Sequence, residues 1–209
     1  MQSIRNADKQ GALIMHNHPG WRHSTLEMTE FEKAVYAEGV VDGVELMNGS
    51  AFYPRTFNTV KEHKLFMTSN TDIHATTAQQ YRYNGHLRNM TIIFAKECTL
   101  ESLREALEAR RTLCYSFGTI GGEEKLLKEF FEASITTKRL SVDKKKKSQR
   151  VMITNTTSLP YTLRIGKGNP VILHPLSSTI VNAKIGKPLQ CTVLNMWCGE
   201  NAHLAVTIK

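Results

Sequence analysis

GALIMHNHP, at residues 11–19, is an apolar run that ends in polar residues, and it predicts a β-strand. TEFEKAVYAEG, at residues 29–39, predicts a helix, because Thr29 and Glu32 have the spacing of a capping box. VDGVELMNG, at residues 41–49, predicts a second strand. A strand, a helix and a strand in this order indicate a parallel βα unit, since a crossover between parallel neighbours needs the helix.

The same alternation continues as far as residue 111. Two further helices and two further strands are predicted, with the helices at 54–64 and 99–111 and the strands at 64–74 and 90–97. Four such units are too few to close a barrel, and an open half-barrel would expose a sheet edge. We therefore expect an α/β fold in which residues 1–125 are the later part of a (β/α) barrel whose N-terminal half is missing from this chain.

The pattern changes at a basic run, DKKKKSQR, at residues 143–150. Residues 150–209 contain short alternating apolar runs separated by Gly, Pro and Asn, without helical periodicity. Such spacing predicts a small antiparallel β-sandwich as a second domain. Residues 126–149, which lie between the two parts, are predicted to form a helix (LLKEFFEAS, 126–134) and a basic linker.

The composition is that of a soluble globular protein, with 41% hydrophobic and 22% charged residues among 209. No apolar stretch approaches the roughly 20 residues that a membrane helix needs, so no membrane partner is expected. The net charge is +8. Nucleic acid is not the favoured partner, because no aromatic residues interleave the lysine run. The four cysteines form no CxxC pair, which indicates core thiols rather than a zinc ribbon or a disulfide framework.

Polar residues collect at three predicted strand ends: His18, then Glu45 and Asn48, then Asp72 and His74. In βα architectures the C-terminal ends of the strands carry the active site. Asp72 and His74 are at positions i and i+2 of a strand, so a carboxylate and an imidazole would face one side and could bind a divalent cation. Each has a simpler interpretation: Asp72 as a helix cap, His74 as a surface residue and Glu45 in a salt bridge. Their joint occurrence favours a site.

These motifs resemble a known family. NHPGW (17–21), GVELMNGSAFYP (43–54), SNTDIH (69–74) and the segment 88–112 are together similar to the later half of a PHP-domain protein. PHP proteins, the polymerase and histidinol phosphatase family, are metal-dependent phosphoesterases. The two-domain members with a small C-terminal β domain are the most similar. The resemblance implies a partial (β/α)7 barrel, and a hydrolase that cleaves a phosphorylated small molecule.

The resemblance also implies roles for individual residues. His18 matches the histidine of the HP motif, and Asp72 and His74 match the family's final metal-binding motif, so these three are the expected metal ligands. Asp72 and His74 are also the expected catalytic residues. The expected cofactors are two or three divalent ions of zinc, manganese or iron, which would activate a water for attack on phosphorus. Three further residues are substrate-binding candidates: Arg88, Glu45 and Asn48.

One departure from the family pattern is large. The opening HxH motif and the other upstream ligands of the family have no counterpart in these 209 residues. The resemblance therefore implies an N-terminally truncated chain that lacks most of its metal ligands, and activity of this chain alone is in question. The alternative is a non-catalytic or degenerate PHP module whose β-sandwich mediates binding.

Overall fold

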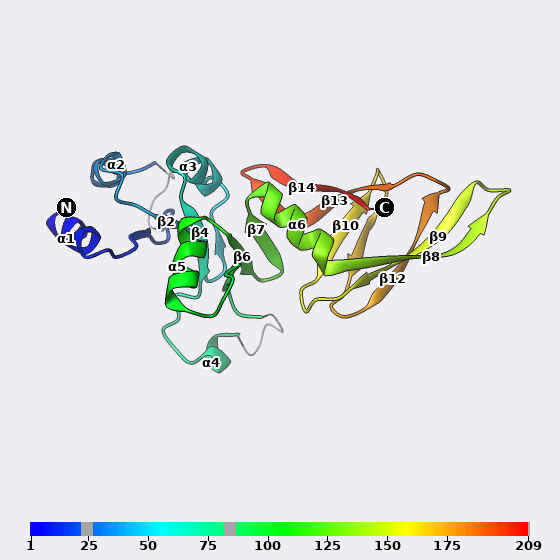
Figure 1. The fold of residues 1–209 in the computed structure, drawn as a ribbon, viewed down its shortest axis with the longest axis horizontal. Helices are drawn as coiled ribbons and strands as arrows, with labels where there is room; N and C mark the ends of the chain where they lie inside the picture. Colours follow the sequence, from blue (N-terminus) through cyan, green and yellow to red (C-terminus); the bar gives the residue numbers. More distant parts are fainter. Residues whose placement is uncertain (22–26, 82–86, 209) are drawn as a thin grey trace. The chain divides into compact units, whose positions relative to one another are not determined.

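The structure is a computed structural model that describes residues 1–21, 27–81 and 87–208 (Figure 1). The chain divides into two compact units. The first contains Met1–Gly122 and Gly199–Asn201, and the second contains Glu123–Cys198 and Ala202–Lys209. Within the described ranges, no helix is both long enough and apolar enough to span a bilayer.

The first unit contains the parallel strands that the sequence predicts. Strand β2 (Gly43–Asn48) lies between β1 (Met15–His16) and β4 (Phe66–Asn70), and it is parallel to both. Helices α2 (Glu30–Ala37) and α3 (Thr56–His63) connect these strands. The capping box of Thr29 and Glu32 is present at the start of α2, which confirms that prediction. Three short elements complete this part: α1 (Gln2–Lys9), β3 (Ala51–Phe52), which pairs with β2, and α4 (Thr77–Tyr81).

The barrel prediction is wrong. Strand β5 (Met90–Ile93) is followed by α5 (Leu100–Glu108), as predicted, but it then pairs antiparallel with β6 (Thr112–Ser116). Strand β6 pairs antiparallel with β7 (Thr119–Gly122). Phe117 and Gly118 form the two-residue turn between them, with φ angles of 45° and 82°, and such turns favour antiparallel hairpins. The described part of the first unit is therefore a parallel sheet beside an antiparallel meander, and no (β/α)7 barrel is formed.

The two sheets of the first unit are joined by close packing and by side-chain hydrogen bonds. The hydroxyl of Thr91 in β5 accepts from the backbone N–H of Ser69 at 2.9 Å and donates to its carbonyl at 3.2 Å. A Cβ on Gly121 in β7 would collide with the buried side chain of Leu46 in β2. A larger residue at position 121 would therefore have to displace Leu46, and the hydroxyl of Thr91 links β4 to β5.

The second unit is built from helix α6 (Glu124–Ser134) and antiparallel strands. One sheet has the order β12–β9–β8, and strands β11, β10, β13 and β14 form the other. Their bounds are β8 (Ile135–Asp143), β9 (Ser148–Asn155), β10 (Tyr161–Ile165), β11 (Pro170–Leu173), β12 (Ser178–Lys184), β13 (Leu189–Gly199) and β14 (Ala202–Ile208). The core is largely apolar and includes Phe131 of α6. Its ring packs edge-on against the ring of Tyr161, with 5.2 Å between the ring centroids.

The lysine run, for which the sequence predicts a linker, forms the turn of the β8–β9 hairpin. Strands β8 and β9 pair from Ile135↔Asn155 to Asp143↔Ser148, and the four lysines connect them. Figure 1 shows this hairpin extending away from α6. The sequence does not predict strand β8, because residues 136–143 are mainly polar or charged. The structure exposes all eight of them. The cysteine prediction holds for Cys114 and Cys191, which are buried, whereas Cys98 is exposed.

Candidate active site at the ends of the parallel strands

Three of the predicted site residues lie at the ends of the parallel strands. His18 follows β1 by two residues, Asn48 is the last residue of β2, and Asp72 follows β4 by two residues. The three strands run in the same direction, so their carboxyl ends meet at one edge of the sheet. In α/β sheets this is the edge outside which ligands bind.

His18 and Asp72 share an unusual backbone conformation. The φ angle is 33° at His18 and 47° at Asp72, which places both in the left-handed region. This region is uncommon for residues other than glycine, and functional sites are enriched in such conformations. The ring of His18 is stacked at a tilt against that of Trp21, with 5.1 Å between centroids. Two of the three predicted metal ligands therefore lie at tight bends that follow outer strands of the parallel sheet.

Glu45 is buried beneath these bends. Its residue exposure is 2%, and it lies in the middle of β2. The carboxylate accepts a hydrogen bond from the backbone N–H of His18. It also accepts from the side-chain amides of Asn48, at 3.0 Å, and Asn70, at 2.7 Å. Three of the candidates (His18, Glu45 and Asn48) are thus in direct contact, together with Asn70, which the sequence analysis did not single out.

Asp72 and Arg88 line a common groove. The groove has a volume of about 590 Å³ and runs between residues 69–72, at the end of β4, and residues 88–91, at the start of β5. Both side chains are exposed. A guanidinium and a carboxylate at one opening can bind a phosphate and a cation, respectively.

The ring of His74 is oriented by the loop that carries Asp72. Its Nδ1 lies 2.7 Å from the carbonyl oxygen of Asp72. A carbonyl can only accept, so Nδ1 carries the proton and Nε2 is left with the lone pair. Metal-binding histidines are commonly oriented in this way, with one nitrogen donating to a backbone carbonyl. The tautomer of His74 therefore suits a ligand role through Nε2.

Tyr53 faces the same region, although the sequence analysis did not consider it. Burial raises the pKa of Tyr53, and the carboxylates of Glu45 and Asp72 raise it further. Its hydroxyl therefore remains protonated and can donate a hydrogen bond near both acidic residues. No spacing rule identifies such a tyrosine, because it follows β3, a two-residue strand that the sequence does not predict.

Asn89 is a second residue that the sequence analysis missed. It is 2% exposed, and its amide donates to the carbonyls of Gly49, at 2.7 Å, and Asn70, at 3.0 Å. Its oxygen accepts from the hydroxyls of Tyr81, at 3.3 Å, and Ser116, at 3.2 Å. Asn89 therefore ties together the loops after β2, β4 and β6 and supports the floor of the groove.

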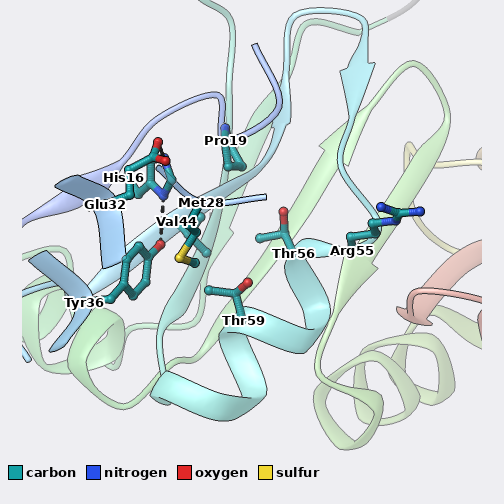
Figure 2. A pocket seen from close by; sticks show the side chains of 9 residues that line it. All are labelled: His16, Pro19, Met28, Glu32, Tyr36, Val44, Arg55, Thr56 and Thr59. Atoms are coloured by element: carbon teal, nitrogen blue, oxygen red, sulfur yellow. Dashed lines mark hydrogen bonds and ion pairs between the residues drawn. The ribbon is translucent and has the colours of Figure 1, made fainter. Parts of the chain in front are cut away.

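His16 has a different role from His18. Its Nε2 lies 3.2 Å from Glu32 and its Nδ1 lies 2.9 Å from the hydroxyl of Tyr36, so both ring nitrogens are engaged by α2. Figure 2 shows these three side chains at one end of a pocket that Thr56 and other residues also line. Burial lowers the pKa of His16, while Glu32 opposes this effect. His16 is thus a wall residue of this pocket.

The described residues do not form a complete metal site. Across residues 1–21, 27–81 and 87–208, no three His, Cys, Asp or Glu side chains lie close enough together to hold an ion. His18, Asp72 and His74 have suitable donor atoms, but they are not gathered into a ligand set by these residues alone. A multinuclear metal centre therefore does not fit the described chain without further ligands.

A solved structure from Bacteroides vulgatus ATCC 8482 is similar to this chain. It is described as a two-domain protein containing a predicted PHP-like metal-dependent phosphoesterase. The two are 30% identical with a TM-score of 0.90, and the match covers 99% of this chain and 64% of that chain. No family model matches the chain, and no curated protein matches it. The chain therefore spans less than two thirds of a two-domain PHP-like protein and has the same fold over that span.

Proposed function

We propose that these 209 residues are part of a metal-dependent phosphoesterase of the PHP type. The observation that carries the proposal is the pair of left-handed bends at His18 and Asp72, which follow two outer strands of one parallel sheet. The similarity to the Bacteroides protein, at 30% identity, supports the same function. In this proposal His18, Asp72 and His74 are metal ligands contributed by this chain.

We propose further that the missing ligands come from polypeptide outside these residues. The match leaves part of the Bacteroides protein without a counterpart in this chain, since it covers 64% of that protein. The chain would then be the N-terminally truncated form of a longer protein.

The substrate-binding surface in this proposal is the groove that Asp72 and Arg88 line. Arg88 is exposed there, and its guanidinium can pair with two oxygens of a phosphorylated small molecule. Glu45 and Asn48 were also predicted to bind substrate. Glu45 is buried and its oxygens already accept three hydrogen bonds, so its contacts favour a supporting role.

The proposal is tested by metal analysis and phosphatase assays on the protein expressed from its complete reading frame. The protein is incubated with zinc, manganese or iron, and the bound metal is measured after dialysis. Hydrolysis of p-nitrophenyl phosphate and of bis(p-nitrophenyl) phosphate is then measured. We expect bound metal, metal-dependent hydrolysis, and a loss of at least about 100-fold in kcat/KM in Asp72→Ala. Asp8→Ala, in an exposed helix, is the control.

Two results would reject this function. Absence of bound metal above background would contradict the ligand assignment. Bound metal without hydrolysis of either ester would instead support the alternative, a non-catalytic PHP module that binds a partner through its β domain.

A further inference from the structure

The positive charge of the chain is concentrated in one three-stranded sheet of the second unit. Strands β8, β9 and β12, with the turns at residues 144–147 and 185–187, contain nine of the chain's 27 Lys and Arg residues but one of its 19 Asp and Glu residues. The 18 remaining basic residues equal the 18 remaining acidic ones, so the net charge of +8 is the charge of this sheet. All nine are exposed: Lys138, Arg139, Lys144, Lys145, Lys146, Lys147, Arg150, Lys184 and Lys187.

These nine cations are not neutralised by neighbouring carboxylates. None of them forms an ion pair with another described residue, whereas Arg5, Arg104 and Arg111 in the first unit each pair with a glutamate. Asp143, the one acidic residue of the sheet, accepts a hydrogen bond from the backbone N–H of Lys146 at 3.0 Å and so stabilises the turn. Like charges held close together repel and lower stability. The stability of the fold therefore does not explain this concentration of charge.

Two turns meet at one end of the sheet and form a basic tip, which we define as residues 144–147 and 184–187. The N–H of Ile185 donates to the carbonyl of Lys147 at 3.2 Å, and the side-chain amide of Gln149 donates to the carbonyl of Lys184 at 3.2 Å. The tip contains six of the nine cations, and the β8–β9 turn lies at the end of the hairpin that extends away from α6 (Figure 1). Lysines on an edge strand can protect a sheet from pairing with another chain. The four lysines of the turn have no strand edge to protect.

Exposed aliphatic side chains lie next to the lysines of the basic tip. Val142, two residues before Lys144, is 43% exposed, and Ile185, directly after Lys184, is 38% exposed. This combination matches an anionic bilayer, where lysines meet lipid phosphates and apolar groups enter the headgroup region. Nucleic acid is less well matched, because the sheet sequence contains no aromatic residue on which a base could stack.

A groove beside the basic tip can accept a lipid headgroup. It has a volume of about 600 Å³, and Lys146 and Arg150 line it together with Ser148 and Asn182. Asp143 also lines it, with its carboxylate engaged by the turn. An ammonium and a guanidinium at one groove can pair with the oxygens of a single phosphate.

We propose that the basic tip docks on the surface of a bilayer that contains anionic phospholipids. The six lysines supply the electrostatic attraction, and Val142 and Ile185 supply the apolar contact. The expectation of no membrane partner concerned segments that span a bilayer, and a contact with its surface requires none. This docking is independent of the phosphoesterase function proposed above, because it uses no residue of the first unit.

The first test is co-sedimentation of the protein, expressed from its complete reading frame, with lipid vesicles. The wild type should bind vesicles of an equimolar mixture of phosphatidylcholine and phosphatidylglycerol, and it should not bind phosphatidylcholine alone. Removal of the four charges of the turn should weaken binding by at least about 100-fold, because each basic residue near an anionic surface adds to the attraction. This variant combines Lys144→Gln, Lys145→Gln, Lys146→Gln and Lys147→Gln.

The matched control removes four charges from exposed lysines outside the sheet, so both variants have the same net charge. It combines Lys9→Gln, Lys61→Gln, Lys96→Gln and Lys125→Gln, and it should weaken binding by less than about 3-fold. Absence of binding to the mixed vesicles overturns the proposal. An equal loss in the two variants also overturns it, because net charge and not the basic tip would then determine binding.

The second test separates a bilayer from other polyanions through the apolar residues. Val142→Ser combined with Ile185→Ser should weaken binding to the mixed vesicles by about 10-fold at about 0.5 M NaCl, where screening of the charges makes the apolar contact dominant. Binding of a single-stranded oligothymidylate should be the same in this variant as in the wild type. The matched control, Ile172→Ser combined with Leu176→Ser, changes two exposed aliphatic residues outside the sheet and should leave vesicle binding unchanged.

Two results of the second test overturn the lipid assignment. One is unchanged vesicle binding in the Val142→Ser and Ile185→Ser variant, and the other is tighter binding of the wild type to the oligothymidylate than to the mixed vesicles. Circular dichroism checks that each variant is folded. If the variant with four substitutions does not fold, Lys144→Gln combined with Lys145→Gln should still weaken vesicle binding by about 10-fold, and wild-type affinity in that folded variant would overturn the proposal.

Discussion

Glu45 in the first unit and Asn155 in the second are both deeply buried polar residues with several hydrogen bonds, and they differ in side-chain chemistry. In the second unit Asn155 is fully buried, and its amide donates to the carbonyls of Leu159, Leu173 and His174. Its oxygen accepts from the N–H and the hydroxyl of Thr157. In the first unit the centre is Glu45, an acidic group that accepts from the three donors described above.

The comparison shows that burial and complete hydrogen bonding do not by themselves indicate a functional site. Asn155 is neutral, and it satisfies backbone groups of loops that carry no predicted ligand, so its role is to stabilise the fold. Glu45 introduces a charge where a neutral amide could also make hydrogen bonds, and it does so beside a left-handed histidine. Such a group is a poor choice for stability alone. The two centres therefore differ in the buried group, which is a carboxylate near the predicted site residues in the first unit and an amide in the second.

The largest expected effect is at Asn155. Asn155→Ala removes one donor from three carbonyls and one acceptor from the N–H and hydroxyl of Thr157, so the free energy of unfolding should fall by about 3 kcal/mol. Urea denaturation followed by circular dichroism measures this change. The exposed Asn182 in β12 is the control, and Asn182→Ala should stay within about 0.5 kcal/mol of the wild type. A loss below about 1 kcal/mol for Asn155→Ala would contradict a stabilising role.

A smaller effect is expected at Asn89, which lies near the site but is neutral like Asn155. Asn89→Ala removes the donor to Gly49 and Asn70 and should lower the free energy of unfolding by about 2 kcal/mol. The same denaturation experiment measures it, with Asn182→Ala in β12 again as control. Wild-type stability in Asn89→Ala would show that the loops after β2 and β4 are held by other contacts.

The smallest expected effect is the change in stability of the second unit with pH. Burial lowers the pKa of His203 below its ordinary 6.5, and Arg164 lowers it further. The unfolded chain then binds a proton at a higher pH than the folded chain does, so stability is retained above pH 6.5 and declines as the pH falls below it. Thermal unfolding at pH 7.5 and pH 5.5 measures the decline. His203→Gln should reduce it, whereas His174→Gln, at an exposed position, should not.

The sequence correctly predicted features that are set by residues close together in the chain. Thr29 and Glu32 are three residues apart, and their capping box is formed as predicted. The strand-end position of Asn48 also follows from local alternation. The prediction that Asp72 and His74 lie in a strand and face one side is wrong, because β4 ends at Asn70 and Asp72 has a φ of 47°. The hairpin at Phe117 and Gly118 was missed, because a phenylalanine with positive φ carries no clear sequence signal. The barrel prediction came from the βα alternation and the family resemblance, and the antiparallel pairing of β6 with β5 and β7 overturns it.

Residues whose roles depend on distant partners were also missed. Asn89 contacts Gly49 and Ser116, which are 40 and 27 residues away in the chain. Asn70 reaches Glu45 across 25 residues. Neither asparagine belongs to a spacing motif, so only the pairing of β2 with β4, and the packing of β4 beside β5, reveals them. The assignment of His18, Asp72 and His74 as metal ligands stays a prediction.

The hairpin turn of Lys144–Lys147 has a practical consequence for handling the protein. Trypsin cleaves after lysine, and these four residues are exposed, so mild digestion should cut the chain here first. Backbone pairing between β8 and β9 runs up to the turn, so the two fragments should stay associated in native buffer and separate only on a denaturing gel. Purified material should therefore be checked for such a hidden nick before it is used in binding or activity measurements.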